Sequence, residues 1–171
     1  MLLAALVAVA AASAVSAAPP PPRRPAVALD ALEQGVLDDI NAFRVSHHLV
    51  PLRLSAGLSD AVRQHTQEMA TDGYFAHESA DGSAFWKRIE RYYPSTSWGY
   101  WSVGENLLWS SPDVDAAGAL KLWIASPEHL ANLLASRWRE IGIAAVHVAA
   151  APGAYRGLDV TIVGTDFGVR R

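Results

Sequence analysis

The order of the hydrophobic patterns along this chain constrains its fold more than any other feature. Leu29, Leu32, Val36, Ile40 and Phe43 recur at steps of three and four residues, which is typical of a helix with one buried face. The end of the chain is different, because residues 141–148 and 158–164 are rich in β-formers and are separated by Pro152-Gly153. Helices followed by a hairpin predict an α+β domain.

The segments between these two ends also carry start and stop signals. Pro51 ends the first helix, and a second helix is expected from Ser55 or Ser59 to Gly73. The remaining expectations are a helix over 83–92, a loop over 95–104, a helix over 113–125 and a short helical turn through Leu134.

Residues 1–18 are almost entirely Ala, Val and Leu, and four prolines follow them at 19–22. Such a segment fits a buried helix, a membrane anchor or a signal peptide. The small residues Val15-Ser16-Ala17 favour a signal peptide that is cleaved after Ala17 or Ala18. The predicted organisation is therefore a signal peptide at 1–18, a stiff Pro-rich linker at 19–28 and a domain at 29–171, with no transmembrane segment after cleavage.

Composition narrows the classes of function. The 171 residues suit one domain, and 14 basic against 17 acidic residues give a net charge of −3, which offers no electrostatic footprint for nucleic acid. The chain has no cysteine, so the core alone must hold the fold, and Cys nucleophiles and Cys-ligated zinc are excluded.

Aromatic residues are concentrated in one part of the chain, since ten of the 15 fall between Tyr74 and Trp109. Most clustered rings fill a core. The alternative is an aromatic-walled groove for an apolar or sugar ligand. Trp98, Tyr100 and Trp101 are the candidates for such a groove, because they lie in a polar, Gly-containing stretch.

Polar candidates for a site are scattered, and the strong short catalytic motifs are absent. His77, Glu105 and His129 are two imidazoles and a carboxylate, a set that suits zinc with one open position or general acid–base chemistry. Gaps of 28 and 24 residues separate them, so spacing alone cannot bring them together.

The chain resembles the bacterial branch of the CAP superfamily, the SCP-like extracellular proteins that also include plant pathogenesis-related proteins and venom allergens. The residues that carry the resemblance are, in order, Asn41-Ala-Phe-Arg44, Leu54, Tyr74-Phe75-Ala76-His77, Gly104-Glu105-Asn106-Leu107, Trp123, Ser126-Pro127-Glu128-His129, Asn132-Leu133-Leu134, Ile141-Gly142-Ile143 and Phe167-Gly168. The resemblance implies an α-β-α sandwich with a small antiparallel sheet. It also implies a central cleft where His77, Glu105 and His129 converge and can hold zinc or another divalent cation.

Four positions depart from the family pattern, and one of them is Leu130, which replaces the usual basic or aromatic residue. Ser126 stands where many eukaryotic members have a second glutamate, which leaves three cleft residues instead of four. Glu128 stands where glycine is usual, so a second carboxylate can enter the cleft, and Asp166 replaces a common glutamine.

Four hypotheses of function follow. The first is a secreted or cell-envelope binding module that takes a lipid, glycan or other envelope component. The second is a metal-dependent hydrolase, in which His77, Glu105 and His129 hold zinc and Glu128 acts as base. A serine hydrolase built from Ser126, His129 and Glu105 is the third, although a serine before proline at a helix start is usually an N-cap. The fourth is a structural envelope protein whose polar trio is a hydrogen-bond network.

Overall fold

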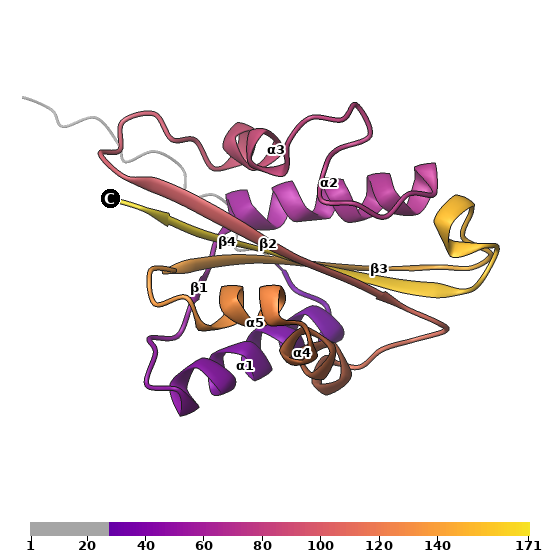
Figure 1. The fold of residues 1–171 in the computed structure, drawn as a ribbon, viewed down its shortest axis with the longest axis horizontal. Helices are drawn as coiled ribbons and strands as arrows, with labels where there is room; N and C mark the ends of the chain where they lie inside the picture. The colour runs from indigo at the N-terminus through magenta and orange to yellow at the C-terminus, as the bar shows by residue number, and fades with distance from the viewer. Residues whose placement is uncertain (1–27) are drawn as a thin grey trace, which may run out of the picture.

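Residues 28–171 form a three-layer sandwich in a computed structural model of the chain (Figure 1). A four-stranded sheet lies in the middle, with α2 (Ala56–Asp72) and α3 (Phe85–Tyr92) above it in this view. The helices α1 (Ala31–Ser46), α4 (Ala116–Ala125) and α5 (Pro127–Leu134) lie below it. The α+β class and the sandwich are therefore confirmed. The predicted signal peptide and nearly all of the predicted linker fall on residues outside the described part of the chain.

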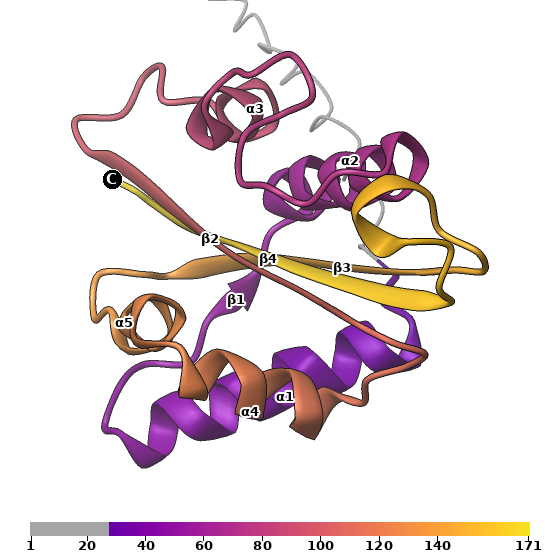
Figure 2. The same cartoon turned by 45° about the vertical axis from the view of Figure 1, so that its right-hand side comes forward.

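The strands follow the order β1-β3-β4-β2 across the sheet. β1 (Arg53–Leu54) pairs with β3 (Glu140–Val148) in parallel, whereas β4 (Val160–Arg170) pairs with β3 and with β2 (Trp101–Ser110) in antiparallel register. A 3₁₀ turn, η1 (Gly153–Tyr155), joins the hairpin strands β3 and β4 at the predicted turn. β2 is thus an edge strand, and Figure 2 shows it passing between the upper and lower helices.

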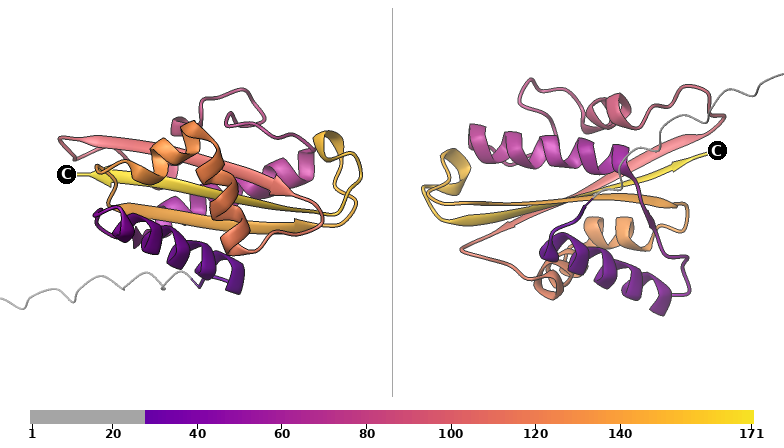
Figure 3. Two further views of the ribbon diagram at one scale, coloured as in Figure 1. Left: turned by 60° about the horizontal axis from the view of Figure 1, so that its bottom comes forward. Right: turned by 180° about the vertical axis from the view of Figure 1, so that it is seen from behind.

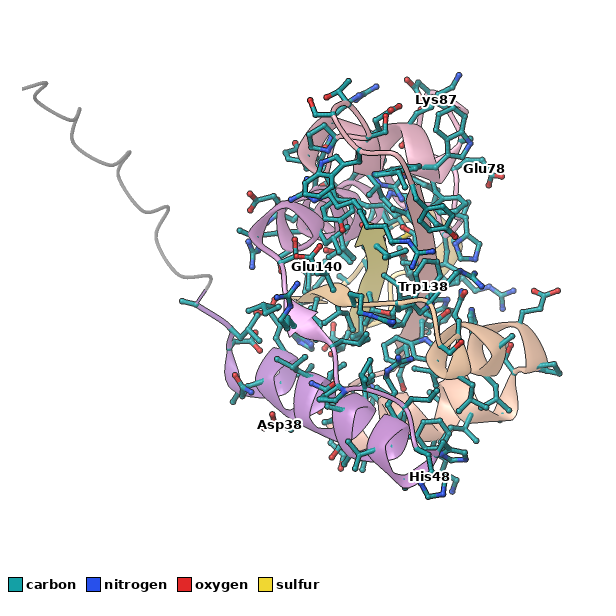
Figure 4. The ribbon with its side chains drawn as sticks, turned by 90° about the vertical axis from the view of Figure 1, so that its left-hand side faces the viewer. Asp38, His48, Glu78, Lys87, Trp138 and Glu140 are labelled. Atoms are coloured by element: carbon teal, nitrogen blue, oxygen red, sulfur yellow. The ribbon has the colours of Figure 1, made fainter. Side chains whose placement is uncertain are left out.

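The two faces of the sheet pack against different helices, as the opposite views in Figure 3 show. The lower core includes Trp123, Trp138 and Phe167, with the rings of the last two stacked 6.1 Å apart. On the upper face, Leu58 and Ala61 of α2 pack with Ile89 and Tyr93. Viewed from the side in Figure 4, Trp138 lies near the middle of the molecule, while Asp38, His48 and Lys87 are at its periphery.

The first motif of the family pattern anchors α1 to the rest of the lower layer. Arg44 is fully buried, and its guanidinium donates to the carbonyls of Val50, Leu133 and Ala135. The Asn41 side chain bonds both the N–H and the C=O of Leu52. Because Leu133 and Ala135 end α5, Arg44 also satisfies carbonyls that have no partner within that helix.

One expectation from the sequence is wrong: residues 101–104 are not loop but the start of β2, which runs on to Ser110. The strand is buried at its centre on both faces, so its sequence lacks the alternation that marks a half-buried strand. β2 is held instead by ten register pairs with β4, a long-range pairing that local pattern does not reveal. β4 likewise extends to Arg170, beyond the predicted end at Gly164.

Gly142 on β3 is required for the contact between α2 and the sheet. A Cβ at this position would lie 2.1 Å from the carbonyl carbon of Leu58, which is backbone and cannot move aside without shifting the helix. We therefore predict that Gly142→Ala lowers the free energy of unfolding by about 3 kcal/mol or more. Gly99→Ala is the matched control, because its Cβ would meet only ordinary contact distances. Equal unfolding midpoints in denaturant for the two variants would contradict the prediction.

Candidate functional site

A cavity of about 410 Å³ opens beside the edge strand β2, between the upper and lower layers. It is lined by residues from the loop before α3, from the start of α3, from β2 and from α5, namely His77, Glu78, Phe85, Val103, Gly104, Glu105, Glu128, His129 and Asn132. His77, Glu105 and His129 therefore do line one cleft, although they lie far apart in the sequence.

Glu105 is the buried centre of this cleft, with a side chain that is 1% exposed. Its Oε1 lies 2.8 Å from Nδ1 of His77, and its Oε2 accepts a hydrogen bond from Nη2 of Arg88 at 2.5 Å. Both carboxylate oxygens thus have a partner. Arg88 belongs to α3 and is also 1% exposed, so this ion pair lies away from water.

Arg88 also holds the loop that carries His77. Its Nη1 donates to the backbone carbonyl of His77 at 3.3 Å and to Oγ of Ser79 at 2.9 Å. One guanidinium thereby joins the helix α3, the loop and the strand β2. The planar guanidinium of arginine carries several N–H donors in fixed directions, so it can bind acceptors on several segments at once.

His77 combines an anchored nitrogen with an accessible ring. Its side chain is 48% exposed, and the contact between Nδ1 and Glu105 leaves Nε2 as the ring nitrogen available to a ligand. The hydrogen bond that the Glu105 carboxylate accepts from His77 raises the pKa of His77, against the opposing effect of partial burial. His77 is therefore protonated over a wider pH range than a free histidine.

His129 is positioned by a pair of asparagines that join β2 to α5. Nδ2 of Asn132 donates to the carbonyl oxygen of Glu105 and to Oδ1 of Asn106, whose own amide donates to the backbone carbonyl of His129. Gly104 makes this approach possible, because a Cβ there would lie 2.9 Å from the Trp138 ring. Burial, and then the charge of His77, lower the pKa of His129, whereas the pKa of His77 is raised, so His129 loses its proton at a lower pH than His77.

Asp166 is a site residue whose role the sequence did not indicate. It lies directly opposite Glu105 in the β2–β4 register, is fully buried, and its two oxygens have no donor among the described residues. Burial and the neighbouring Glu105 charge raise the pKa of Asp166 well above its ordinary value, and Arg88 only partly opposes them. Burial and the Glu105 charge therefore both favour the neutral form of the Asp166 carboxyl.

The zinc expectation meets a specific difficulty in this geometry. Within residues 28–171 no group of three or more His, Asp or Glu side chains is placed to hold a metal ion. The reason lies in Glu105, because its two oxygens already bind His77 and Arg88. As placed, the Glu105 carboxylate contacts His77 and Arg88 and does not converge with the two histidines on one point, so the three residues do not form a zinc site.

A second, more apolar pocket of about 280 Å³ adjoins the first along β2. It is lined by Phe75, Leu107, Leu108, Trp109, Leu122, Trp123, Ser126 and His129. His129 lines both pockets, so its side chain lies where the two neighbour each other. Among these residues, Phe75 is 38% exposed and Leu122 is 49% exposed.

The remaining candidates from the sequence fall in different places. Ser126 is at the N-cap position of α5 but makes no capping hydrogen bond through its side chain, and it lines the apolar pocket. Glu105 pairs with His77, whereas a Ser126–His129–Glu105 triad would need it beside His129. Glu128 does reach the polar pocket, as expected from its replacement of glycine.

The three groove candidates line neither of the two pockets above. Trp98 and Tyr100 are 45% and 40% exposed, and the guanidinium groups of Arg170 and Arg171 lie over their rings. Trp101 is in β2, where its Nε1 donates to the carbonyl of Tyr93. An aromatic groove at these residues stays a prediction.

Comparison with known proteins gives the family. The profile of CAP, described as the Cysteine-rich secretory protein family, matches residues 37–155. The chain belongs to the CAP family. Its membership does not depend on cysteine, because this CAP domain has none.

Two curated relatives of this CAP domain come from Bacillus subtilis. The uncharacterised membrane protein YlbC is 27% identical over 65% of this chain and 30% of its own length, and the uncharacterised protein YkwD is 29% identical over 68% and 43%. The chain therefore spans less than half of either relative.

Solved structures show the same fold. An extracellular protein containing a SCP domain from Bacillus anthracis is 24% identical, with a TM-score of 0.61 over 81% of this chain and 40% of that one. An outer surface protein of Borrelia burgdorferi is 17% identical, with a TM-score of 0.62 over 81% of this chain and 92% of that one. Within residues 28–171, no helix has the length and apolar character to cross a bilayer.

The protonation of Asp166 can be tested through the pH dependence of stability. Because its pKa is higher in the folded state, this contribution to stability is full below the ordinary value of 3.8 and is lost as pH rises through the folded-state pKa. Asn at this position has nearly the same shape but no ionisable proton. We predict that the melting temperature of Asp166→Asn, relative to wild type, is higher at about pH 8 than at about pH 4.

The control for this prediction is Asp113→Asn, which makes the same change in charge at a side chain that is 77% exposed. Its difference from wild type should change little between the two pH values. A pH-independent difference for Asp166→Asn would mean that Asp166 is ionised in the folded protein.

Proposed function

We propose that this CAP domain is a secreted binding module that holds an amphiphilic component of the cell envelope along β2. The observation that carries the proposal is the pair of adjoining pockets that meet at His129, one with hydrogen-bonding side chains and one apolar. A ligand with a polar headgroup and an apolar tail matches both halves at once. The names of the solved relatives, an extracellular protein and an outer surface protein, support a site of action outside the cytoplasm.

The charges of the polar pocket indicate which headgroup it takes. Glu78 and Glu128 line it and are exposed, whereas the charge of Glu105 is balanced by Arg88. These two carboxylates at the rim repel an anionic headgroup and can accept hydrogen bonds from hydroxyl groups. The side chains of Phe85 and Asn132 add an aromatic surface and an amide. We infer a neutral, hydroxyl-bearing headgroup such as a sugar, with an apolar chain in the neighbouring pocket.

Hydrolysis has less support than binding. A metal-dependent reaction would need Glu105 as a free ligand, and its oxygens are taken up by His77 and Arg88. A purely structural role accounts for the Asn106–Asn132 network but not for two open pockets with exposed apolar side chains such as Leu122.

The probe for this proposal is a non-ionic alkyl glycoside, titrated calorimetrically below its critical micelle concentration. We predict saturable binding that Leu122→Gln weakens about tenfold, because burying one leucine side chain is worth that much affinity or more. Leu158→Gln is the matched control, since Leu158 is 45% exposed and lies outside both pockets. Octanoate, an anionic amphiphile, should bind more weakly than a glycoside with the same chain length.

Absence of saturable binding to the wild-type protein would overturn the proposal and favour the structural role. An equal effect of the two leucine variants would show that binding is non-specific. Tighter binding of octanoate would contradict the inferred headgroup.

A further inference from the structure

Glu105 and the two cleft histidines are the residues from which the family resemblance leads one to expect a metal site, yet the structure gives Glu105 a different cation. The guanidinium of Arg88 binds its Oε2. The opposite oxygen bonds His77, so the carboxylate has no oxygen left without a partner. A protein cation therefore does for Glu105 what a bound metal ion would do, which is to neutralise a buried carboxylate.

The surroundings of Arg88 show that it is fixed in this place. Its side chain is 1% exposed, and beyond Glu105 it donates to Ser79 and to the carbonyl of His77. Three partners on two segments hold one guanidinium, so it cannot swing out to water without breaking all three contacts. A guanidinium is also always charged, so a divalent ion placed at Glu105 would meet a fixed positive charge.

We propose that Arg88 is a positioning residue that serves as the resident cation of the cleft, balances the charge of Glu105, keeps Glu105 aimed at His77, and prevents zinc from binding there. The cleft then holds His77 in one orientation without a metal. This inference concerns the cation of the cleft and does not depend on which ligand the pockets take. It can fail while the proposed function holds, and the proposed function can fail while this inference holds.

The experiment compares zinc binding by the wild-type protein with that of two variants. Arg88→Met removes the charge and keeps most of the side-chain volume, and Arg88→Gln also removes the charge but retains a hydrogen-bond donor for Glu105. Zinc chloride is titrated calorimetrically near neutral pH, and each protein is compared with a partner that also carries His77→Ala. The side chain of His77 is 48% exposed, so its removal leaves the core intact.

We expect no His77-dependent zinc binding in the wild type. In Arg88→Met or Arg88→Gln, zinc should bind roughly ten- to a hundredfold more tightly than any His77-independent binding that the wild type shows, and this gain should disappear with His77→Ala. Arg53→Met is the control, because it removes an exposed arginine that faces Glu140 at 4.0 Å outside the cleft. It should leave zinc binding unchanged.

Two results would overturn the inference. One is His77-dependent zinc binding by the wild-type protein, which would show that Arg88 does not exclude the metal. The other is a folded Arg88 variant that gains no zinc affinity, which would show that something other than Arg88 keeps zinc out of the cleft. If neither variant folds, the comparison of wild type with His77→Ala still tests the inference, because His77-dependent zinc binding by the wild type would overturn it.

Discussion

The ion pair between Arg88 and Glu105 is the interaction on which the rest of the cleft depends. Both side chains are 1% exposed, and a carboxylate buried this deeply without a partner would be protonated or would unfold its surroundings. Losing one member of such a pair costs about 3–5 kcal/mol, because the other charge stays buried. The pair joins α3 of the upper layer to the edge strand β2, so the wall of the cleft and its charge balance are set by one contact.

The other features of the site follow from the position of Glu105. On one side, His77 is turned by its bond to Oε1, so that its second ring nitrogen is left for a ligand. On the other, the backbone carbonyl of Glu105 accepts a hydrogen bond from the Asn132 side chain. This bond holds α5, and therefore His129, against β2. Because His129 lines both pockets, the same strand that holds the buried ion pair also determines where a polar headgroup and an apolar tail can meet.

Local sequence predicted the helices well but could not predict the site in full. The second helix ends before Gly73, and the hairpin turns at residues 152–153, because helix stops and turns depend on nearby residues. His77, Glu105 and His129 were brought together by the family resemblance and not by spacing. Arg88 gave no local signal, since one arginine on an amphipathic helix usually faces water. Asp166 becomes a partner of Glu105 only through the β2–β4 register, in which residues 61 positions apart lie opposite each other.

The central claim is that the Glu105 carboxylate raises the pKa of His77. Measuring that pKa by NMR titration tests the claim most directly. Wild type should titrate above the ordinary value of 6.5, because protonated His77 is stabilised by the Glu105 carboxylate. In Glu105→Gln, which keeps the shape but not the charge, burial and Arg88 remain as opposing influences, so the pKa of His77 should fall. A pKa that is the same in both proteins would contradict the account, since Glu105 would then have no influence on the exposed imidazole of the cleft.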